Sequence, residues 1–424
     1  MKVDFPYGSG TIALELPDTT TVLAPPLVPA APDATAAIAA ALAAPIGTPP
    51  LAALVRPNMR VAIAVCDGTR PQPRAAVCGA ILDAIGATIP DQDITVLVAT
   101  GTHRANTAEE LEEMFGAEWC RRLSILNHDA RDDASLVDLG TMGSDVPVML
   151  NRAWVEADFK ITTGFVEPHF FAGYSGGPKL VAPGLAGMRT ILALHDARRI
   201  GSPSATWGVI EHNTVHDDVR AIAAKTGVDF SCDVVLNRDH EVVAAFSGEL
   251  FQMHAAARAR AEADCRVVAP ERYDIVVTSN SGYPLDQNLY QAVKGMSAAA
   301  RLVKDGGLIV VVAECRDGMP AHGEFTALLQ AHDTPAALLA AIDAAATTRP
   351  DQWQAQILAR LCERTRIALY ADGLSAAERT SAFVEPVEDV GALVAAEMAR
   401  RAPTARCAAL IRGPESLVVL APDA

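Results

Sequence analysis

The sequence has few positive charges for its length. Its 424 residues hold 35 lysine and arginine against 51 aspartate and glutamate side chains, a formal net charge of -16. No run of five or more basic residues occurs. A surface for nucleic acid or for an anionic membrane needs a positive footprint, so we expect neither partner. A small anionic substrate stays compatible with this charge, because it needs only a local cluster of arginine, lysine and backbone N–H groups.

Paired cysteines and long apolar runs are also lacking. The eight cysteines are scattered without a C-x-x-C pair, which is typical of reduced thiols in a cytosolic protein rather than of a disulfide framework. The most apolar early stretch, residues 36–54, is mostly alanine, and Pro45, Pro49 and Pro50 interrupt it. It is therefore no membrane span of about 20 residues. The residues after Met1 show no apolar signal-peptide core. We therefore expect a soluble, cytoplasmic protein.

The composition is nonetheless that of a folded protein, and the length predicts two domains. Hydrophobic residues make up 50% and charged residues 20% of the chain, within the globular range. A single core stops growing at roughly 250–300 residues. A helix expected to end near Cys265 gives way to a strand from Asp274, which predicts domains over 1–268 and 269–402. The remaining strand and tail, 403–424, could return to the N-terminal domain.

Short β-rich apolar runs alternate with segments at helical spacing. This alternation predicts an α/β fold class, with two α/β domains and mainly parallel sheets. The expected strands are 61–65, 94–99, 159–163, 274–279, 308–313 and 417–420. The expected helices are 35–44, 74–85, 108–115, 187–199, 252–265, 334–344 and 389–401.

Polar turns follow several expected strands at their carboxyl ends. Asp67 and Arg70 follow the first strand, His103 follows the second, and His169 follows the third. Ligands of open α/β sheets bind outside the carboxyl ends of the strands. We therefore expect these four side chains to meet in one crevice. The alternative for each turn taken alone is an ordinary β–α connection that begins a helix.

A glycine-rich run over 173–180 ends in Pro178-Lys179-Leu180. It is not a Walker A loop, because that motif needs Gly-Lys-Ser/Thr. Pro178 lacks the N–H that should face phosphate, and Leu180 replaces the magnesium ligand, so ATP hydrolysis is disfavoured. A lysine after such a turn can be partly desolvated and act as a nucleophile toward carbonyl-type carbon. The alternative is a surface lysine.

Two further patterns involve helices. None of His103, His169 and His195 forms a His-x-x-x-His or His-Glu-x-x-His pair, so a zinc-protease site has no support from them. His195 lies in the expected helix over 187–199, where a lone histidine is usually structural. Read as a helix, the segment 284–295 places side chains on one polar face, which is either solvated surface or a wall of a cleft; they are Gln287, Tyr290, Gln291 and Lys294.

Taken together, these motifs resemble the nickel-pincer-nucleotide lactate racemase family. The match begins at residues 45–51 and 67–71, continues through 101–104 and 167–179, and ends clearly at 286–295. The resemblance implies two α/β domains with the active site in the cleft between them, and a cofactor-binding role for the N-terminal domain. It implies a nickel-pincer nucleotide, pyridinium-3-thioamide-5-thiocarboxylic acid mononucleotide with nickel, attached covalently to Lys179. His195 matches the nickel ligand.

The resemblance also implies roles for the remaining candidates. His103 and His169 match the acid/base catalysts, and Arg70 and Lys294 match catalytic residues that face the substrate. Further positions match the residues that hold the cofactor, with Trp353 placed by spacing only; they are Asp67, Thr69, Thr102, Ser175, Gly176, Gly177, Tyr290, Gln291 and Trp353.

The implied function is a racemase or epimerase of a 2-hydroxy acid, lactate or a related carboxylate. The reaction is a reversible hydride transfer from C2 to the lysine-bound nickel nucleotide, with two histidines as acid and base. The implied partners are the small 2-hydroxy acid and the proteins that synthesise the cofactor. Two alternatives stay open: a metal-dependent hydrolase or lyase with His103, His169 and His195 directly on the metal, and a non-catalytic protein that binds the nickel nucleotide.

Overall fold

The computed structural model describes residues 1–143, 145–321 and 323–421, and the chain forms two compact units. The N-terminal unit comprises Leu27–His195 and Ser204–Asp264. The C-terminal unit comprises Met1–Pro26, Asp196–Pro203 and Cys265–Ala424.

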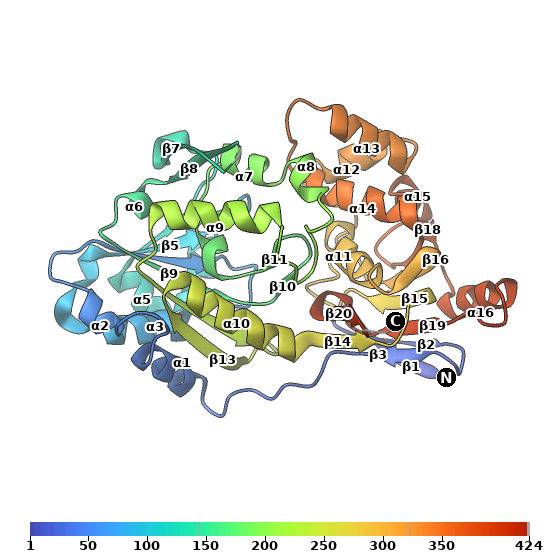
Figure 1. Ribbon diagram of the computed structural model, residues 1–424, viewed down its shortest axis with the longest axis horizontal. Coiled ribbons are helices and arrows are strands. Elements are labelled where there is room, and N and C mark those ends of the chain that lie inside the picture. Colours follow the sequence, from blue (N-terminus) through green and yellow to red (C-terminus); the bar gives the residue numbers. More distant parts are fainter. Residues whose placement is uncertain (144, 322, 422–424) are drawn as a thin grey trace. The chain divides into compact units, whose positions relative to one another are not determined.

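The N-terminal unit is built on a six-stranded sheet in the order β13-β12-β9-β4-β5-β6. Strands β5, β9 and β13 of this sheet are labelled in Figure 1. All neighbours run parallel except β13, which is antiparallel to β12. The central strand β4 is buried at every position, as expected of a continuous apolar run in a parallel sheet covered on both faces. The strands are β4 (Val61–Cys66), β5 (Ile94–Ala99), β6 (Ser124–Asn127), β9 (Phe159–Phe165), β12 (Phe230–Leu236) and β13 (Val242–Gly248).

Helices cover this sheet, and successive residues of β12 show its two faces. Val234 packs into the main core with Ile38, Val77 and Ile81, whereas Val235 packs against Met253. The helices are α1 (Ala34–Ala43), α2 (Leu51–Leu54), α3 (Arg74–Ile85), α4 (Ala108–Phe115), α5 (Ala117–Arg122), α6 (Arg152–Val155), α7 (Met188–Leu194), α9 (Thr214–Thr226) and α10 (Leu250–Cys265). Two short ribbons complete the unit: β7 (Leu136–Met142) with β8 (Val146–Asn151), and β10 (Pro168–His169) with β11 (Gly173–Tyr174).

The C-terminal unit holds a second six-stranded sheet, β18-β17-β16-β15-β19-β3, in which all neighbours run parallel. Its strands are β3 (Thr21–Leu23), β15 (Tyr273–Ser279), β16 (Val303–Val312), β17 (Arg366–Tyr370), β18 (Glu385–Pro386) and β19 (Cys407–Leu410). Its helices are α8 (Ala197–Ile200), α11 (Leu289–Ala299), α12 (Phe325–Gln330), α13 (Pro335–Ala344), α14 (Gln352–Arg364), α15 (Ala376–Ser381) and α16 (Val390–Arg400). Two strand pairs complete the unit: β1 (Lys2–Tyr7) with β2 (Gly10–Glu15), and β14 (Arg266–Ala269) with β20 (Leu417–Leu420). The predicted class, α/β with mainly parallel sheets, is confirmed.

The compact units differ from the predicted domains at both ends of the chain. The first 26 residues belong to the C-terminal unit, because β3 pairs with β19 at the edge of its sheet. The described part of the tail, residues 403–421, also belongs to the C-terminal unit, because β19 pairs with β15 and β20 with β14. Strand pairing between residues far apart in sequence decides both placements.

The predicted helix over 187–199 is wrong in one respect, because it is interrupted at His195. His195 has φ -112° and ψ 21° and caps the end of α7. The next residue, Asp196, begins α8 by accepting a hydrogen bond from the Arg199 backbone N–H at 2.7 Å. An aspartate competes for N–H groups in this way at helix starts, and apolar periodicity alone does not reveal it.

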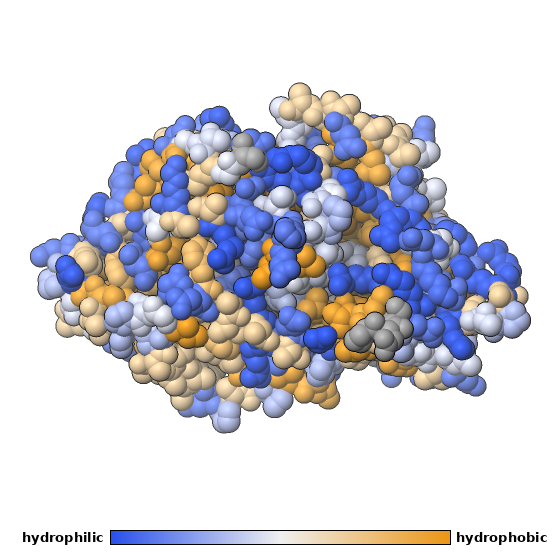
Figure 2. All heavy atoms as spheres, in the orientation of Figure 1, coloured by the Kyte–Doolittle hydropathy of each residue, from blue (hydrophilic) through white to orange (hydrophobic). Residues whose placement is uncertain are grey.

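Polar and apolar residues are intermingled on the surface seen in Figure 2. Within the described residues, no helix is long and apolar enough to cross a membrane.

Candidate active site

The three predicted turns of the N-terminal unit lie at one edge of its sheet. Strand β4 pairs with β5 on one side and with β9 on the other, and all three run parallel. Their carboxyl ends therefore meet at the same edge. Asp67 follows β4, His103 lies in the turn after β5, and His169 follows β9.

Asp67 and His103 form a hydrogen-bonded pair. The Nδ1 atom of His103 lies 2.7 Å from Oδ2 of Asp67. Thr69 donates to the other carboxylate oxygen through its backbone N–H at 2.8 Å and through its hydroxyl at 2.5 Å. An ionised carboxylate only accepts, so Nδ1 of His103 carries a proton. In the neutral ring the lone pair is then on Nε2, which makes Nε2 the atom that can take a proton from a substrate.

The environment of Asp67 keeps its carboxylate ionised. The side chain is buried, and burial alone would raise its pKa. The hydrogen bond and charge of His103, the charge of Arg70 and the hydrogen bond from Thr69 outweigh burial and hold the pKa of Asp67 well below its usual range. The pair is thus a fixed anion next to an imidazole, an arrangement suited to stabilising an imidazolium.

Arg74, the first residue of α3, holds the turn that carries Asp67. Its buried guanidinium donates to the carbonyl of Cys66 at 2.7 Å, to that of Gln72 at 3.1 Å and to that of Arg70 at 2.6 Å. It also donates to the carbonyl of Asp67. One side chain therefore fixes the backbone on both sides of Asp67 and Thr69.

Replacing Arg74 by methionine is expected to lower the free energy of unfolding by about 3 kcal/mol, because buried carbonyl groups lose their donor. Urea denaturation of the purified variant measures this loss. The control is Arg122→Met, which removes an exposed arginine paired with Asp91 at 2.8 Å and Glu118 at 3.2 Å. That change is expected to cost about 1 kcal/mol or less. Equal losses in the two variants would contradict the role given to Arg74.

A pocket of about 340 Å³ opens beside the Asp67–His103 pair. Besides that pair, Thr69, Arg104 and Asn106 contribute to its lining. His103 is exposed, so its ring is accessible to a solute. Arg70 is also exposed and lies in the same turn, within electrostatic reach of Asp67. The backbone carbonyl of Thr102 accepts a hydrogen bond from the Arg131 guanidinium at 3.4 Å.

Phe171 gathers three other candidates around its ring. The His169 ring lies edge-on to it at 4.5 Å between centroids, and the His195 ring at 5.3 Å. The Lys179 ammonium lies 5.9 Å from the ring centroid. Asn213 holds this segment by donating to the Phe171 carbonyl at 2.9 Å. His169, Lys179 and His195 are therefore brought together on one apolar aromatic residue.

The hydrogen bonds of His195 and His169 assign their tautomers. Nδ1 of His195 lies 2.7 Å from the Ile191 carbonyl, so Nδ1 carries the proton and Nε2 has the lone pair that a metal requires. Nδ1 of His169 instead accepts the backbone N–H groups of Phe171 and Ala172 at 3.4 and 3.2 Å. Neutral His169 therefore carries its proton on Nε2, opposite to His103.

The predicted cofactor turn is held by the Ser175 hydroxyl and contains two glycines with positive φ. The Ser175 hydroxyl accepts a hydrogen bond from the Glu167 backbone N–H and donates one to the Phe165 carbonyl, both at 2.9 Å. Gly176 and Gly177 have φ of 70° and 50°, a backbone region that favours glycine. Lys179 follows in a short 3₁₀ turn (Gly177–Leu180).

The predicted residues of the C-terminal unit lie on α11 and α14. Trp353 donates its indole N–H to the Tyr290 hydroxyl at 3.0 Å, which brings these two residues together. Gln291 and Lys294 are half-buried on the same helix as Tyr290. Gln287 is not on that helix, because Asn288 caps its start by accepting the Gln291 N–H at 3.0 Å. The predicted face is therefore shorter than the sequence suggested.

A metal site made of protein side chains alone finds no support in this geometry. Among the described residues, no group of three His, Cys, Asp or Glu side chains is arranged to hold a metal ion. One His-x-x-x-His pair exists elsewhere, at His212 and His216. Asn213 caps α9 between them, so the two rings do not share a helix face.

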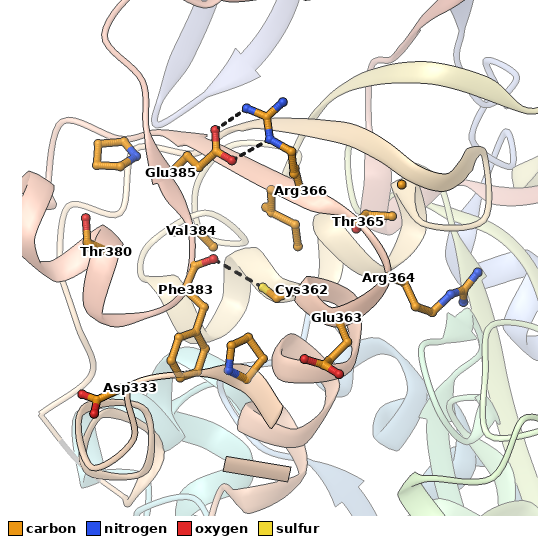
Figure 3. Close-up of a pocket in the computed structure, with 14 residues that line it drawn as sticks. Asp333, Cys362, Glu363, Arg364, Thr365, Arg366, Thr380, Phe383, Val384 and Glu385 are labelled. Atoms are coloured by element: carbon orange, nitrogen blue, oxygen red, sulfur yellow. Dashed lines mark hydrogen bonds and ion pairs between the residues drawn. The ribbon is translucent and has the colours of Figure 1, made fainter. Parts of the chain in front are cut away.

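In a pocket of about 700 Å³ in the C-terminal unit, Arg366 and Cys362 are engaged with other lining residues (Figure 3). Arg366 binds Glu385 and Glu397, each at 2.8 Å. Cys362 donates its thiol to the Phe383 carbonyl at 3.6 Å, and burial raises the pKa of this thiol to about 12. A protonated thiol and a paired guanidinium offer little chemistry.

Several residues that shape the site were missed by the sequence reasoning. Arg74 and Phe171 act through tertiary contacts that no local spacing reveals. Two others, Asp233 on β12 and His254 on α10, contact the glycine-rich turn from distant segments. An aspartate inside an apolar strand is the sequence signal that could have found Asp233, whereas the burial of Arg74 is visible only in the structure.

Comparisons with known proteins match both parts of the chain. The lactate racemase N-terminal domain matches residues 7–208, and the lactate racemase C-terminal domain matches residues 268–413. A lactate racemase of Thermoanaerobacterium thermosaccharolyticum is 35% identical over 395 residues, 92% of each chain. A lactate racemase of Lactiplantibacillus plantarum is 38% identical over 329 residues, 77% of each chain.

Solved structures give the same picture. The lactate racemase apoprotein from T. thermosaccharolyticum superposes with a TM-score of 0.93 at 33% identity, over 99% of this chain and 100% of that one. A protein from Thermotoga maritima, at 16% identity and a TM-score of 0.69, shares the fold. The predicted enzyme class, an isomerase of the racemase type, is confirmed. The chain belongs to the lactate racemase family.

Proposed function

We propose that this protein interconverts the enantiomers of a 2-hydroxy acid, lactate or a close relative, with a nickel-pincer nucleotide attached to Lys179. The observation that carries the proposal is the Asp67–His103 pair at 2.7 Å in the same unit as the group around Phe171. A proton-transfer pair and a lysine–histidine cofactor group are the two parts that this reaction requires.

The residues present fit the proposed cofactor. Lys179 offers a half-buried amine for covalent attachment at the end of the glycine-rich turn. His195 is buried, and the lone pair on its Nε2 suits a nickel ligand. Ser175, Gly176 and Gly177 would hold the nucleotide, and Tyr290, Gln291 and Trp353 would contribute from the C-terminal unit. When bound, the nickel nucleotide supplies a reversible hydride acceptor.

The protein's own groups manage the substrate carboxylate and hydroxyl. Arg70 pairs with the carboxylate, in a bidentate manner where geometry permits, and Lys294 adds a second cation. A neutral imidazole would take the hydroxyl proton while the bound cofactor supplies the acceptor for the C2 hydride, which leaves a planar 2-keto acid. The reverse on the opposite face, with a proton returned to oxygen, would give the other enantiomer with no net oxidation.

The two histidines begin from different tautomers. His103 presents Nε2 as the proton acceptor, and Asp67 stabilises the imidazolium that forms. His169 presents an Nε2–H while Nδ1 is held by backbone N–H groups. His103 can therefore take the hydroxyl proton as it stands, whereas His169 can take one for the other enantiomer only after its own proton moves from Nε2 to Nδ1, which displaces the two backbone N–H donors.

The test uses protein produced together with the proteins that synthesise the cofactor. We expect a nucleotide-sized mass adduct on the Lys179 peptide, stoichiometric nickel, and conversion of single-enantiomer lactate to a racemic mixture measured by chiral chromatography. The T. thermosaccharolyticum enzyme prepared in the same way is the control. An adduct without turnover of any 2-hydroxy acid tried would indicate a non-catalytic nickel-nucleotide protein. No adduct and no nickel, with an active control, would reject the proposal.

A further inference from the structure

Two buried polar side chains form hydrogen bonds to the turn that carries Lys179. Asp233 lies on β12 with a relative exposure of 0%, and His254 lies on α10 with 1%. Asp233 occupies the same strand face as Val235, two residues on, and that face packs against α10, the helix of His254. Neither residue belongs to the proton-transfer pair or to the group around Phe171.

Both side chains bind the backbone of the turn directly. The Gly177 N–H donates to Oδ2 of Asp233 at 2.6 Å. Nε2 of His254 donates to the Ser175 carbonyl at 2.8 Å. The Asp233 carboxylate thus accepts a hydrogen bond from a backbone N–H two residues before Lys179. The His254 imidazole donates one to a backbone carbonyl four residues before Lys179.

The glycine pair in the turn is what lets these groups approach. A Cβ added to Gly176 would lie 2.7 Å from Oδ2 of Asp233. A Cβ added to Gly177 would lie 2.7 Å from the ring of His254. Any other residue would push the turn away from both side chains. Glycine is therefore needed at positions 176 and 177 both for the close approach of Asp233 and His254 and for the positive φ angles.

Both side chains are costly to bury. Nδ1 of His254 is buried and lacks a hydrogen bond within the described residues, and the backbone N–H groups of Gly177 and Gly164 offset only part of the effect of burial on Asp233. Burial raises the pKa of Asp233 to about 6 and lowers that of His254 to about 3. Such groups cost stability that apolar residues of similar size would not. Their presence points to a positional role.

We propose that Asp233 and His254 are positioning residues that hold the turn in the conformation in which Lys179 receives the cofactor. The proposal rests on the attachment at Lys179 proposed above. Both residues act through the backbone of Ser175 and Gly177, so neither is a catalytic residue.

The test compares variants that remove these hydrogen bonds to the turn with variants that keep them. Asp233→Ala loses the acceptor, whereas Asp233→Asn keeps an oxygen for the Gly177 N–H. His254→Asn shortens the side chain and loses the donor at the Nε2 position, whereas His254→Gln keeps a donor there. Hydrogen exchange of the Gly177 amide is measured on protein without cofactor. The fraction of Lys179 carrying the adduct is measured after production with the cofactor-synthesis proteins.

Loss of either hydrogen bond, in Asp233→Ala or His254→Asn, is expected to speed hydrogen exchange of the Gly177 amide by about tenfold. The fraction of Lys179 that carries the adduct is expected to fall by a similar factor. The conservative variants Asp233→Asn and His254→Gln should leave both readouts near wild type. Ser231→Ala is the matched control, because Ser231 is buried on the same strand face and bonds the Thr162 hydroxyl at 2.7 Å. It should lower stability without changing either readout. His254→Asn keeps a polar side chain and provides the second test should Asp233→Ala not fold.

The outcomes separate this inference from the proposed function. A wild-type protein without adduct, beside a loaded control enzyme, overturns the proposed function and this inference with it. A loaded wild type with equally loaded Asp233→Ala and His254→Asn variants overturns the positioning role alone. Unchanged Gly177 exchange in those variants does the same.

Discussion

Lys179→Ala is expected to abolish covalent cofactor attachment and all racemisation. The amine of Lys179 is the proposed point of attachment, and alanine offers no nucleophile in its place. Peptide-level mass spectrometry should find no adduct, and chiral chromatography should find no second enantiomer after prolonged incubation. Lys179→Arg should behave in the same way, because a guanidinium stays protonated and does not acylate under these conditions.

The matched control is Lys160→Ala. Lys160 lies on β9 of the same unit and donates to the Ala157 carbonyl at 2.9 Å, away from the glycine-rich turn. That variant should keep the adduct and the activity. A Lys179→Ala protein that still carries the adduct would show that another residue holds the cofactor, and the assignment would be lost.

Asp67→Asn is expected to lower kcat on the order of a thousandfold while the adduct on Lys179 is kept. An amide keeps the size of the carboxylate but favours the wrong His103 tautomer and no longer stabilises the imidazolium, an effect of about 10⁴-fold on kcat in serine proteases. His103→Ala and His169→Ala should likewise keep the adduct and lose interconversion. Steady-state kinetics on variants with equal adduct content measures these losses.

The same substitution has a pH signature in stability. The pKa of Asp67 in the folded protein lies below its usual value of about 3.9, so the carboxylate stabilises the fold above that pH. The stabilisation is lost as pH falls through the folded-state pKa. Denaturation at pH 7 should show Asp67→Asn to be less stable than wild type, and the difference should shrink below about pH 4. A constant difference across that range would mean that the charge of Asp67 has no part in it.

Much of the fold could be predicted because the relevant signals are local. The apolar runs at β4, β5 and β9, and the helical spacing at α3 and α4, are patterns within single segments. A strand buried on both faces must be apolar throughout, and a covered helix must be apolar on one side, so these elements are visible in the sequence. Even the capping box of α4, Thr107 with Glu110, is a local feature.

The predictions went wrong where a single polar residue overrides a pattern. Asp196 ends the predicted helix at His195, and Asn288 removes Gln287 from the predicted helix face. Both act as N-caps, whose side chains compete with the helical hydrogen-bond ladder. The unit boundaries differed for another reason, since β3 pairs with β19 across nearly the whole sequence.

The sequence by itself determined the α/β class, the order of the strand-end turns and the identity of the candidates His103, His169, Lys179 and His195, because each is written in residues that are neighbours along the chain. Only the tertiary structure decided which of these residues interact. The pairing of His103 with Asp67 and the hydrogen bonds of Asp233 and His254 to the lysine turn join residues 36 to 79 positions apart. The clustering around Phe171 depends on how the chain folds back between His169 and His195. Such contacts depend on strand order and on close packing, which set distances in space that spacing along the chain does not encode.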